Sequence, residues 1–90
     1  MIEKEYTITA PEGMHARPAT ALVRLAKNFT SVISICKDDK TVRLNSLLNI
    51  LSMAIKGGDV LRVRIHGEDE ITAAGALDDF FADINAVPDL

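Results

Sequence analysis

A short stretch near the start of the chain, residues 13–19, combines a histidine, an arginine and a proline in an arrangement that could do chemistry. Pro18 follows His15 by three residues, and helices accept proline only in their first turn. The imidazole should therefore lie at or near a helix N-cap, where backbone N–H groups are unpaired and the helix dipole is positive. Such a helix end binds anions, phosphate above all. We expect the backbone N–H groups of Ala16 and Arg17, together with the Arg17 guanidinium, to hold a phosphoryl group beside the ring.

Nothing else in the sequence equips the chain to run phosphoryl transfer by itself. It has no Walker-type loop, no carboxylate cluster for a metal ion, and no Cys or His pair with metal-ligand spacing. We therefore expect neither a metal nor a cofactor. His15 should act as an unprotonated nucleophile that accepts a phosphoryl group from one protein and gives it to another. The alternative is a surface histidine without a chemical role.

The residues around His15 carry two further expectations. Glu12 places a carboxylate near the ring, which should favour the protonated imidazole and disfavour a neighbouring phosphate unless the carboxylate points away. The small residues Gly13, Ala16 and Ala19 should leave room for another protein to approach the imidazole.

The composition is that of an ordinary globular domain, residues 1–90, with 48% hydrophobic and 26% charged residues. A formal net charge of −3, without a Lys/Arg cluster among aromatic residues, argues against nucleic acid as a partner. No apolar run approaches the roughly 18 residues of a membrane span, and the first residues do not resemble a signal peptide. The single Cys36 can form no internal disulfide, so we expect a cytoplasmic protein without membrane insertion.

Hydrophobic periodicity predicts the element order β-α-β-β-α-β-α. Alternation predicts strands over residues 2–9, 32–37, 41–44 and 60–65, and helical stripes predict helices over residues 16–28, 47–55 and from the acids at 68–70 onward. The two middle strands should form an antiparallel hairpin, because the turn between them is short. Each strand leaves polar side chains on one side. The pattern therefore predicts an α+β fold, in which one antiparallel sheet has helices on a single face and water on the other.

The two later helices carry more specific expectations. Ser46 is a favoured N-cap, and the apolar run after it continues to Ile55. Gly75 in the last helix suggests close packing, because a mid-helix glycine costs up to about 1 kcal/mol relative to alanine. The core-facing stripe of this helix should comprise Ile71, Ala74, Leu77, Phe81 and Ile84, with Asp78, Asp79 and Asp83 on its outer face. Residues 88–90 should form a loose tail.

The run Gly13-Met14-His15-Ala16-Arg17-Pro18-Ala19 closely resembles the active-site signature of HPr, the histidine phosphocarrier family of the bacterial phosphoenolpyruvate:sugar phosphotransferase system. The resemblance covers the whole chain in length and element order. It implies an open-faced β-sandwich, a four-stranded antiparallel sheet under three helices. It also implies a carrier, not itself an enzyme, that takes phosphate from Enzyme I and passes it to sugar-specific IIA domains. His15 would hold the phosphate on Nδ1 with Arg17 as its electrostatic partner, and we expect the carrier to be a monomer.

Ser46 matches a second position of that family. In many Gram-positive members a serine there is phosphorylated by a dedicated ATP-dependent kinase, HPr kinase/phosphorylase, which slows transfer at the histidine and promotes binding to a transcriptional regulator. A helix N-terminus tolerates a phosphate, so an N-cap role and a regulatory role are compatible. Asn45 and Asn49 depart from the lysine and glycine common at their positions, which puts the identity of the partners in question.

The apolar run after Ser46 cannot face a core on every side, so part of it should be exposed and form the centre of a partner interface with a basic rim. This predicted interface comprises Met14, Thr20, Arg24, Lys27, Leu47, Leu48 and Leu51. Two other functions stay open: a regulatory paralogue, of the nitrogen-related or catabolite-control type, that does not serve sugar uptake, and a pure protein-binding module. Residues interpreted as structural or solvated are Cys36, Arg62, Arg64 and His66.

Overall fold

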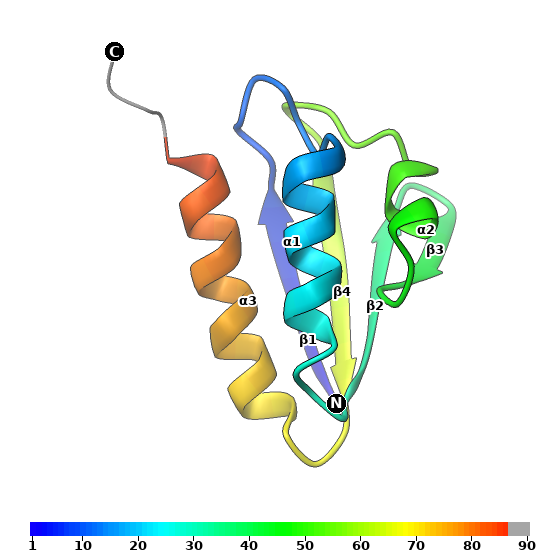
Figure 1. Ribbon diagram of the computed structural model, residues 1–90, viewed down its shortest axis with the longest axis vertical. Helices are drawn as coiled ribbons and strands as arrows, with labels where there is room; N and C mark the ends of the chain where they lie inside the picture. The colour runs from blue at the N-terminus through cyan, green and yellow to red at the C-terminus, as the bar shows by residue number, and fades with distance from the viewer. Residues whose placement is uncertain (87–90) are drawn as a thin grey trace.

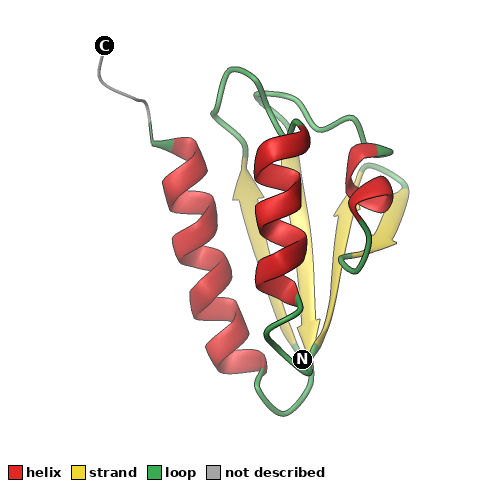
Figure 2. Cartoon of the chain, in the orientation of Figure 1, coloured by secondary structure: helices red, strands yellow, loops and turns green. Residues whose placement is uncertain are grey.

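A four-stranded antiparallel sheet with the strand order β1-β4-β2-β3 carries three helices on one of its faces (Figures 1 and 2). The computed structural model describes residues 1–86, so the predicted tail at 88–90 lies outside the described residues. The strands are β1 (Ile2–Thr7), β2 (Val32–Lys37), β3 (Lys40–Arg43) and β4 (Val60–His66), and the helices are α1 (Ala16–Ala26), α2 (Leu47–Leu51) and α3 (Glu70–Asn85). The predicted fold class and element order are confirmed.

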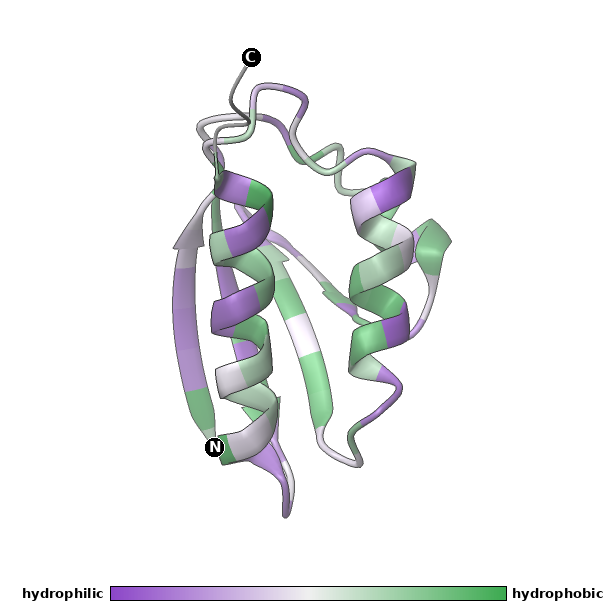
Figure 3. Cartoon of the chain, turned by 60° about the vertical axis from the view of Figure 1, so that its left-hand side comes forward, coloured by the Kyte–Doolittle hydropathy of each residue, from purple (hydrophilic) through white to green (hydrophobic). Residues whose placement is uncertain are grey.

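Strict alternation in β4 explains why only one face of the sheet is covered. Leu61, Val63 and Ile65 are buried, whereas Arg62 and Arg64 point to the open face. β4 lies between β1 and β2 and pairs with both, so its three apolar side chains form the middle of the core. The helices mirror this pattern, and Figure 3 shows hydrophobic and hydrophilic residues alternating along α1 and α3.

The longest helix, α3, buries a narrower stripe than the sequence predicted. Leu77 and Phe81 are 1% exposed, and the Phe81 ring stacks on Tyr6 with 4.2 Å between centroids. Ile71, however, is 80% exposed, so its expected place on the stripe was wrong. Ile71 comes six residues before Leu77, a spacing that puts the two on different sides of a helix.

Asp78 is exposed, as predicted for the outer face, but its side chain also reaches the neighbouring strand. Its carboxylate accepts hydrogen bonds from the Tyr6 hydroxyl at 2.6 Å and from the Lys4 ammonium at 3.2 Å, and so links α3 to the edge strand β1. The Tyr6 hydroxyl, more than the Lys4 charge, holds the pKa of Asp78 below its usual range. Burial, assisted by the Asp78 carboxylate, raises the pKa of the Tyr6 phenol. The ion pair between Lys4 and Asp78 thus explains why a lysine lies on the apolar side of β1.

Gly75 does not mark a close contact. A Cβ built on it meets no atom within 4 Å beyond the helix's own backbone, so the packing expected there is wrong. We expect Gly75→Ala to raise the free energy of unfolding by about 0.5–1 kcal/mol, because alanine loses less backbone entropy in a helix. Urea unfolding at neutral pH measures this. The control Ala82→Gly, at an exposed position of the same helix, should lower stability by a similar amount; a loss of stability in Gly75→Ala would contradict the open environment.

The second helix is much shorter than predicted and ends at Leu51 rather than Ile55. After Leu51 the hydrogen bonds tighten to i→i−3: the Met53 N–H donates to the Ile50 carbonyl at 3.1 Å and the Ala54 N–H donates to the Leu51 carbonyl at 3.2 Å. Two ammonium groups from the β2–β3 hairpin bind the free carbonyls of this exit segment. Lys37 Nζ donates to the carbonyls of Met53 and Ala54, both at 3.0 Å, and Lys40 Nζ donates to the Ser52 carbonyl at 3.1 Å. Ala54 then turns the chain away with a φ of 49°, in the left-handed region. A smaller difference is that α1 ends at Ala26 rather than residue 28.

Asp69 fastens the α1–β2 loop to the turn before α3. Its Oδ1 accepts from the Ser31 N–H at 2.9 Å and the Ser31 hydroxyl at 2.5 Å, and its Oδ2 accepts from the Thr30 N–H at 2.8 Å. These bonds, the Ser31 hydroxyl above all, hold the pKa of Asp69 below its usual range. Asp69 therefore joins two loops, in addition to being the N-cap residue of α3.

The depressed pKa of Asp69 predicts an acid-sensitive stability. A carboxylate whose pKa is lower in the folded state contributes stability that is present above its unfolded value, about 3.9, and is lost as the pH falls through the folded value. Asp69→Asn should destabilise the protein at pH 7, because one amide –NH2 would then face an N–H donor at Ser31 or Thr30. Denaturant unfolding from pH 7 to pH 2 should show the two stabilities converging at low pH.

The matched control for this prediction is Asp83→Asn, which changes an exposed carboxylate on α3 without a side-chain hydrogen bond within residues 1–86. Its stability curve should run parallel to that of the wild type. A constant gap between the Asp69→Asn and wild-type curves over the whole pH range would show that the charge of Asp69 is not what stabilises the loops.

Candidate functional site

The loop between β1 and α1 is held in place by the segment that follows α2. The Met14 N–H donates to the Ile55 carbonyl at 3.1 Å, and the Gly13 N–H donates to the Ala10 carbonyl at 2.9 Å, which closes a turn. Gly13 has a φ of 64°, and a Cβ placed on it would overlap the Ile55 carbonyl oxygen and lie 2.7 Å from the Lys56 Cα. Only glycine permits both this backbone conformation and this approach. The loop is therefore pinned immediately before His15.

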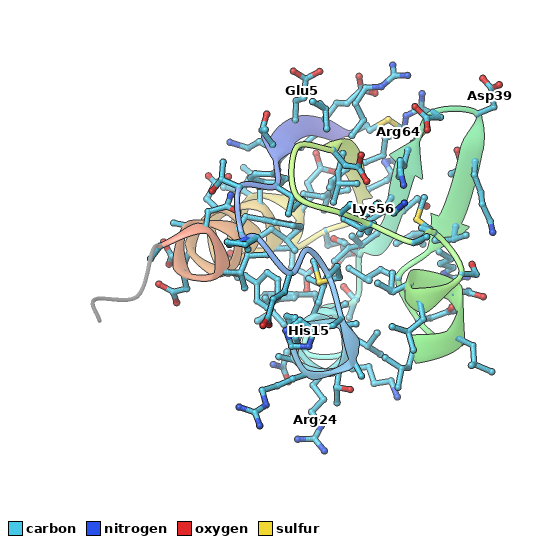
Figure 4. The ribbon with its side chains drawn as sticks, turned by 90° about the horizontal axis from the view of Figure 1, so that it is seen from above. Glu5, His15, Arg24, Asp39, Lys56 and Arg64 are labelled. Carbon is cyan, nitrogen blue, oxygen red and sulfur yellow. The ribbon has the colours of Figure 1, made fainter. Side chains whose placement is uncertain are left out.

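His15 is the N-cap residue of α1, as the sequence predicted. Its φ of −82° and ψ of −174° are extended, and the helix begins at the next residue. Within residues 1–86 no side chain caps this helix start, so the backbone N–H groups of Ala16 and Arg17 have neither an intrahelical nor a capping partner. The imidazole is 48% exposed. Figure 4, which looks onto this end of the molecule, shows His15 at the entrance to α1.

Glu12 does not point away from the ring. Its Oε2 lies 3.1 Å from Nε2 of His15, while the Glu12 side chain itself is 79% exposed. The other ring nitrogen, Nδ1, forms no side-chain hydrogen bond or ion pair with residues 1–86. The effect of Glu12 on phosphorylation therefore depends on which nitrogen reacts, because the carboxylate contacts Nε2 and not Nδ1.

The remaining α1 residues of the site differ in how far their side chains are exposed to a partner. Arg17 is exposed, and Arg24, seven residues later, lies on the same face of the helix and is exposed too. Lys27, just after the helix, is also exposed. Thr20 is half-buried, and its hydroxyl donates to the Ala16 carbonyl at 2.7 Å. The cations therefore form a basic edge along α1, whereas the Thr20 hydroxyl is already used within the helix.

Met14 is the one residue of the predicted interface that the structure removes from the surface. It is 4% exposed and belongs to the core, because its N–H bond to Ile55 turns the loop inward. Gly13 and Ala19 are buried as well, so of the three small residues only Ala16 stands open beside the ring. The contact of Gly13 with Ile55 was missed, although a glycine directly before a helix start was its visible signal.

The α2 residues are partly available. Leu48 is 77% exposed and Leu51 is 37% exposed, so an apolar surface does exist, as predicted. Leu47 is half-buried and packs against the core. α1 and α2 pack against each other, so the exposed leucines and the cations of α1 belong to adjacent helices. Exposed leucines on α2 and exposed cations on α1 are therefore available, and the partner interface stays a prediction.

Ser46 is the N-cap of α2, and its Oγ accepts from the Asn49 N–H at 3.4 Å. The two residues that depart from the resembled family touch each other here: Asn49 Nδ2 lies 3.3 Å from the Asn45 Oδ1 and also donates to the Arg43 carbonyl at 3.2 Å. The side chains of Asn45 and Asn49 therefore form one unit that flanks Ser46.

Two further findings bear on the kind of protein. Within residues 1–86 no three His, Cys, Asp or Glu side chains come together as metal ligands. Among the same residues, every helix is too short or too polar to cross a lipid bilayer.

Comparisons with known proteins agree with this geometry. The family model described as "PTS HPr component phosphorylation site" matches residues 2–83. Phosphocarrier protein HPr of Xylella fastidiosa is 38% identical over 81 residues, 90% of this chain and 91% of that protein. Phosphocarrier protein HPr of Buchnera aphidicola is 41% identical over 70 residues, 78% of this chain and 82% of that protein.

Solved structures agree in fold as well as in sequence. HPr from Thermoanaerobacter tengcongensis superposes with a TM-score of 0.90 at 34% identity, covering 98% of this chain and 99% of that one. Crh, the catabolite repression protein of Bacillus subtilis, in a crystal structure of a swapped dimer, superposes with a TM-score of 0.73 at 28% identity, covering 98% of this chain and 100% of that one. Since the family model spans nearly all of the chain and the relatives align over most of their own length, the chain belongs to the HPr family of phosphocarrier proteins.

Proposed function

We propose that this chain carries a phosphoryl group on His15, taking it from phospho-Enzyme I and passing it to IIA domains of the phosphotransferase system. The observation that carries the proposal is the position of His15. It is a half-exposed N-cap residue whose ring meets Glu12 at Nε2 and whose neighbouring backbone N–H groups are free. Membership of the HPr family supplies the reaction class, and a carrier of this kind turns over only with its partners.

The chemistry assigned to each group follows from its atoms. The Nδ1 lone pair attacks phosphorus, a new N–P bond forms, and the bond from phosphorus to the donor's nitrogen breaks with its electron pair returning to the donor. The phosphoryl oxygens gain hydrogen bonds from the N–H groups of Ala16 and Arg17 and from the Arg17 guanidinium. The backbone donors are fixed before the reaction, so they stabilise the transferred charge without reorganising.

The surface next to His15 is suited to partners with an acidic rim around an apolar patch. Leu48 and Leu51 supply the apolar centre, with Arg24 and Lys27 at its edge. Leu47 and Thr20 contribute less than the sequence suggested, because both are half-buried. We assign Enzyme I and the IIA domains to this surface.

The experiment is to incubate the protein with phosphoenolpyruvate and catalytic amounts of Enzyme I and to measure the intact mass. We expect a gain of one phosphoryl group that is lost in acid and retained in alkali, as for a phosphohistidine, and transfer from it to a IIA domain. Absence of any gain would contradict the carrier role. It would favour a regulatory paralogue, the function suggested by the similarity to the catabolite repression protein Crh.

Ser46 is proposed as a second, regulatory phosphorylation site. Support comes from its place at the start of α2, beside the exposed leucines of the partner surface. A phosphate there would add negative charge to a surface with a basic rim and weaken docking of Enzyme I. With ATP and an HPr kinase, we expect an acid-stable phosphate that is absent in Ser46→Ala and present in the control Ser52→Ala. Phosphorylation that persists in Ser46→Ala would remove the assignment.

A further inference from the structure

Glu12 is the only carboxylate of residues 1–86 within ion-pair distance of the His15 ring, and its contact is with Nε2. We propose that Glu12 is a positioning residue that keeps the proton of the neutral imidazole on Nε2, so that Nδ1 presents its lone pair to the phosphoryl donor. The proposal deepens the assigned function of the same site and rests on it for the consequences in transfer, but the tautomer itself exists without any partner.

The tautomer follows from the kind of atoms in contact. An ionised carboxylate is only an acceptor, and in a neutral imidazole one nitrogen is a donor and the other an acceptor. With Glu12 Oε2 at 3.1 Å from Nε2, an unprotonated Nε2 would bring its electron density close to the negative carboxylate and be repelled by it. A proton on Nε2 turns the same contact into an attraction. The lone pair of the ring is then on Nδ1, the nitrogen that Glu12 leaves uncovered.

The backbone brings Glu12 close to His15. The turn closed between Ala10 and Gly13 reverses the chain, and the left-handed conformation of Gly13 brings residue 12 back toward residue 15. The contact of Gly13 with Ile55 and Lys56 fixes that turn on the body of the protein. Both side chains are exposed to water, so the ion pair contributes little energy. It still favours one tautomer of the ring over the other.

The same carboxylate serves both halves of the transfer. When Nδ1 forms its bond to phosphorus, Nε2 keeps its proton and the ring becomes positively charged; a carboxylate beside Nε2–H stabilises that charge, as the carboxylate does in a Ser-His-Asp triad. On transfer to the next acceptor, the electron pair of the N–P bond returns to Nδ1 and the ring leaves as neutral imidazole. No proton has to enter or leave the ring in either direction. A phosphate on Nδ1 lies on the side of the ring away from Glu12, which limits the repulsion.

The test measures the ring tautomer and the rate of phosphoryl transfer in separate experiments. Nitrogen-15 NMR of the ring, at a pH where it is neutral, should show Nε2 protonated and Nδ1 unprotonated in the wild type and in Glu12→Gln, whose amide oxygen still accepts. In Glu12→Ala the shifts of the two nitrogens should move toward each other, as in a free imidazole side chain. Single-turnover transfer from phospho-Enzyme I should slow about two- to fivefold in both variants, the range that an exposed charge pair supplies. Glu5→Gln, an exposed carboxylate on the open face of the sheet, is the control and should match the wild type in both readouts.

Two results would overturn the inference: ring shifts in Glu12→Ala equal to those of the wild type, or an Nδ1-protonated ring in the wild type. If the wild type has the expected tautomer and loses it in Glu12→Ala but takes no phosphate from Enzyme I, the positioning by Glu12 is upheld and the proposed function fails. If the shifts change and transfer rates do not, Glu12 sets the tautomer without assisting transfer, and the claimed benefit for the reaction is overturned.

Discussion

His15→Gln should take no phosphoryl group from phospho-Enzyme I, whereas His66→Gln should be phosphorylated as fully as the wild type. The two histidines are the only ones in the chain, so they form a matched pair. Both rings are exposed, 48% for His15 and 69% for His66, so neither replacement opens a cavity in the core. They differ in surroundings: His15 stands at the start of α1, and His66 ends β4 with its Nδ1 3.9 Å from Glu70. Glutamine keeps polar atoms but cannot form a phosphohistidine.

The measurement is the intact mass after incubation with phosphoenolpyruvate and Enzyme I, with thermal unfolding of each variant run in parallel. We expect complete loss of the acid-labile phosphate in His15→Gln at an almost unchanged melting temperature. An acid-labile phosphate that survives this substitution would place the acceptor elsewhere in the chain. If His66→Gln also lost the phosphate while staying folded, phosphorylation would require His66 as well as the residues at the start of α1.

Local patterns account for most of what could be predicted. Alternation in β4 and the position of Pro18 after His15 are local signals, since each depends on residues a few positions apart, and both led to correct elements. The path of the chain after α2 depends instead on Lys37 and Lys40, which reach across from the β2–β3 hairpin to the carbonyls of residues 52–54. No pattern within the apolar run after Ser46 carries that information, so the helix was predicted too long.

The candidate site shows the same division. A histidine at an N-cap can be recognised from its neighbours, but the burial of Met14 depends on Ile55, far along the chain. The approach of Glu12 to Nε2 depends on how the turn at Gly13 rests against Ile55 and Lys56. The residue types at the candidate site could therefore be read from the sequence, whereas the orientation of their side chains could not. Gly13 combines a local requirement, its positive φ, with a long-range one, its contact with Ile55 and Lys56.

Gly13→Ala should destabilise the protein by about 2–5 kcal/mol, a large part of the roughly 5–15 kcal/mol typical of a small domain. Two costs add. An L-residue in the left-handed region costs roughly 1–2 kcal/mol, and forcing a methyl group into a packed site costs about 1–3 kcal/mol more. The obstruction is rigid, since the Cβ would overlap the Ile55 carbonyl oxygen and lie 2.7 Å from the Lys56 Cα, both backbone atoms. The β1–α1 loop would have to leave the α2–β4 segment, and His15 would lose its fixed place before α1.

Gly58→Ala is the control that separates the two costs. Gly58 also has a positive φ, 96°, but a Cβ on it meets nothing within 4 Å, so it should lose only the conformational part, about 1–2 kcal/mol. Urea unfolding of both variants gives the difference, and hydrogen exchange at the Met14 amide, bonded to the Ile55 carbonyl, should accelerate in Gly13→Ala alone. Equal losses of stability would show that backbone conformation, rather than the contact with Ile55 and Lys56, makes glycine necessary at position 13. A larger loss in Gly13→Ala, with slower phosphorylation of His15, would tie the geometry of the acceptor to this single close approach.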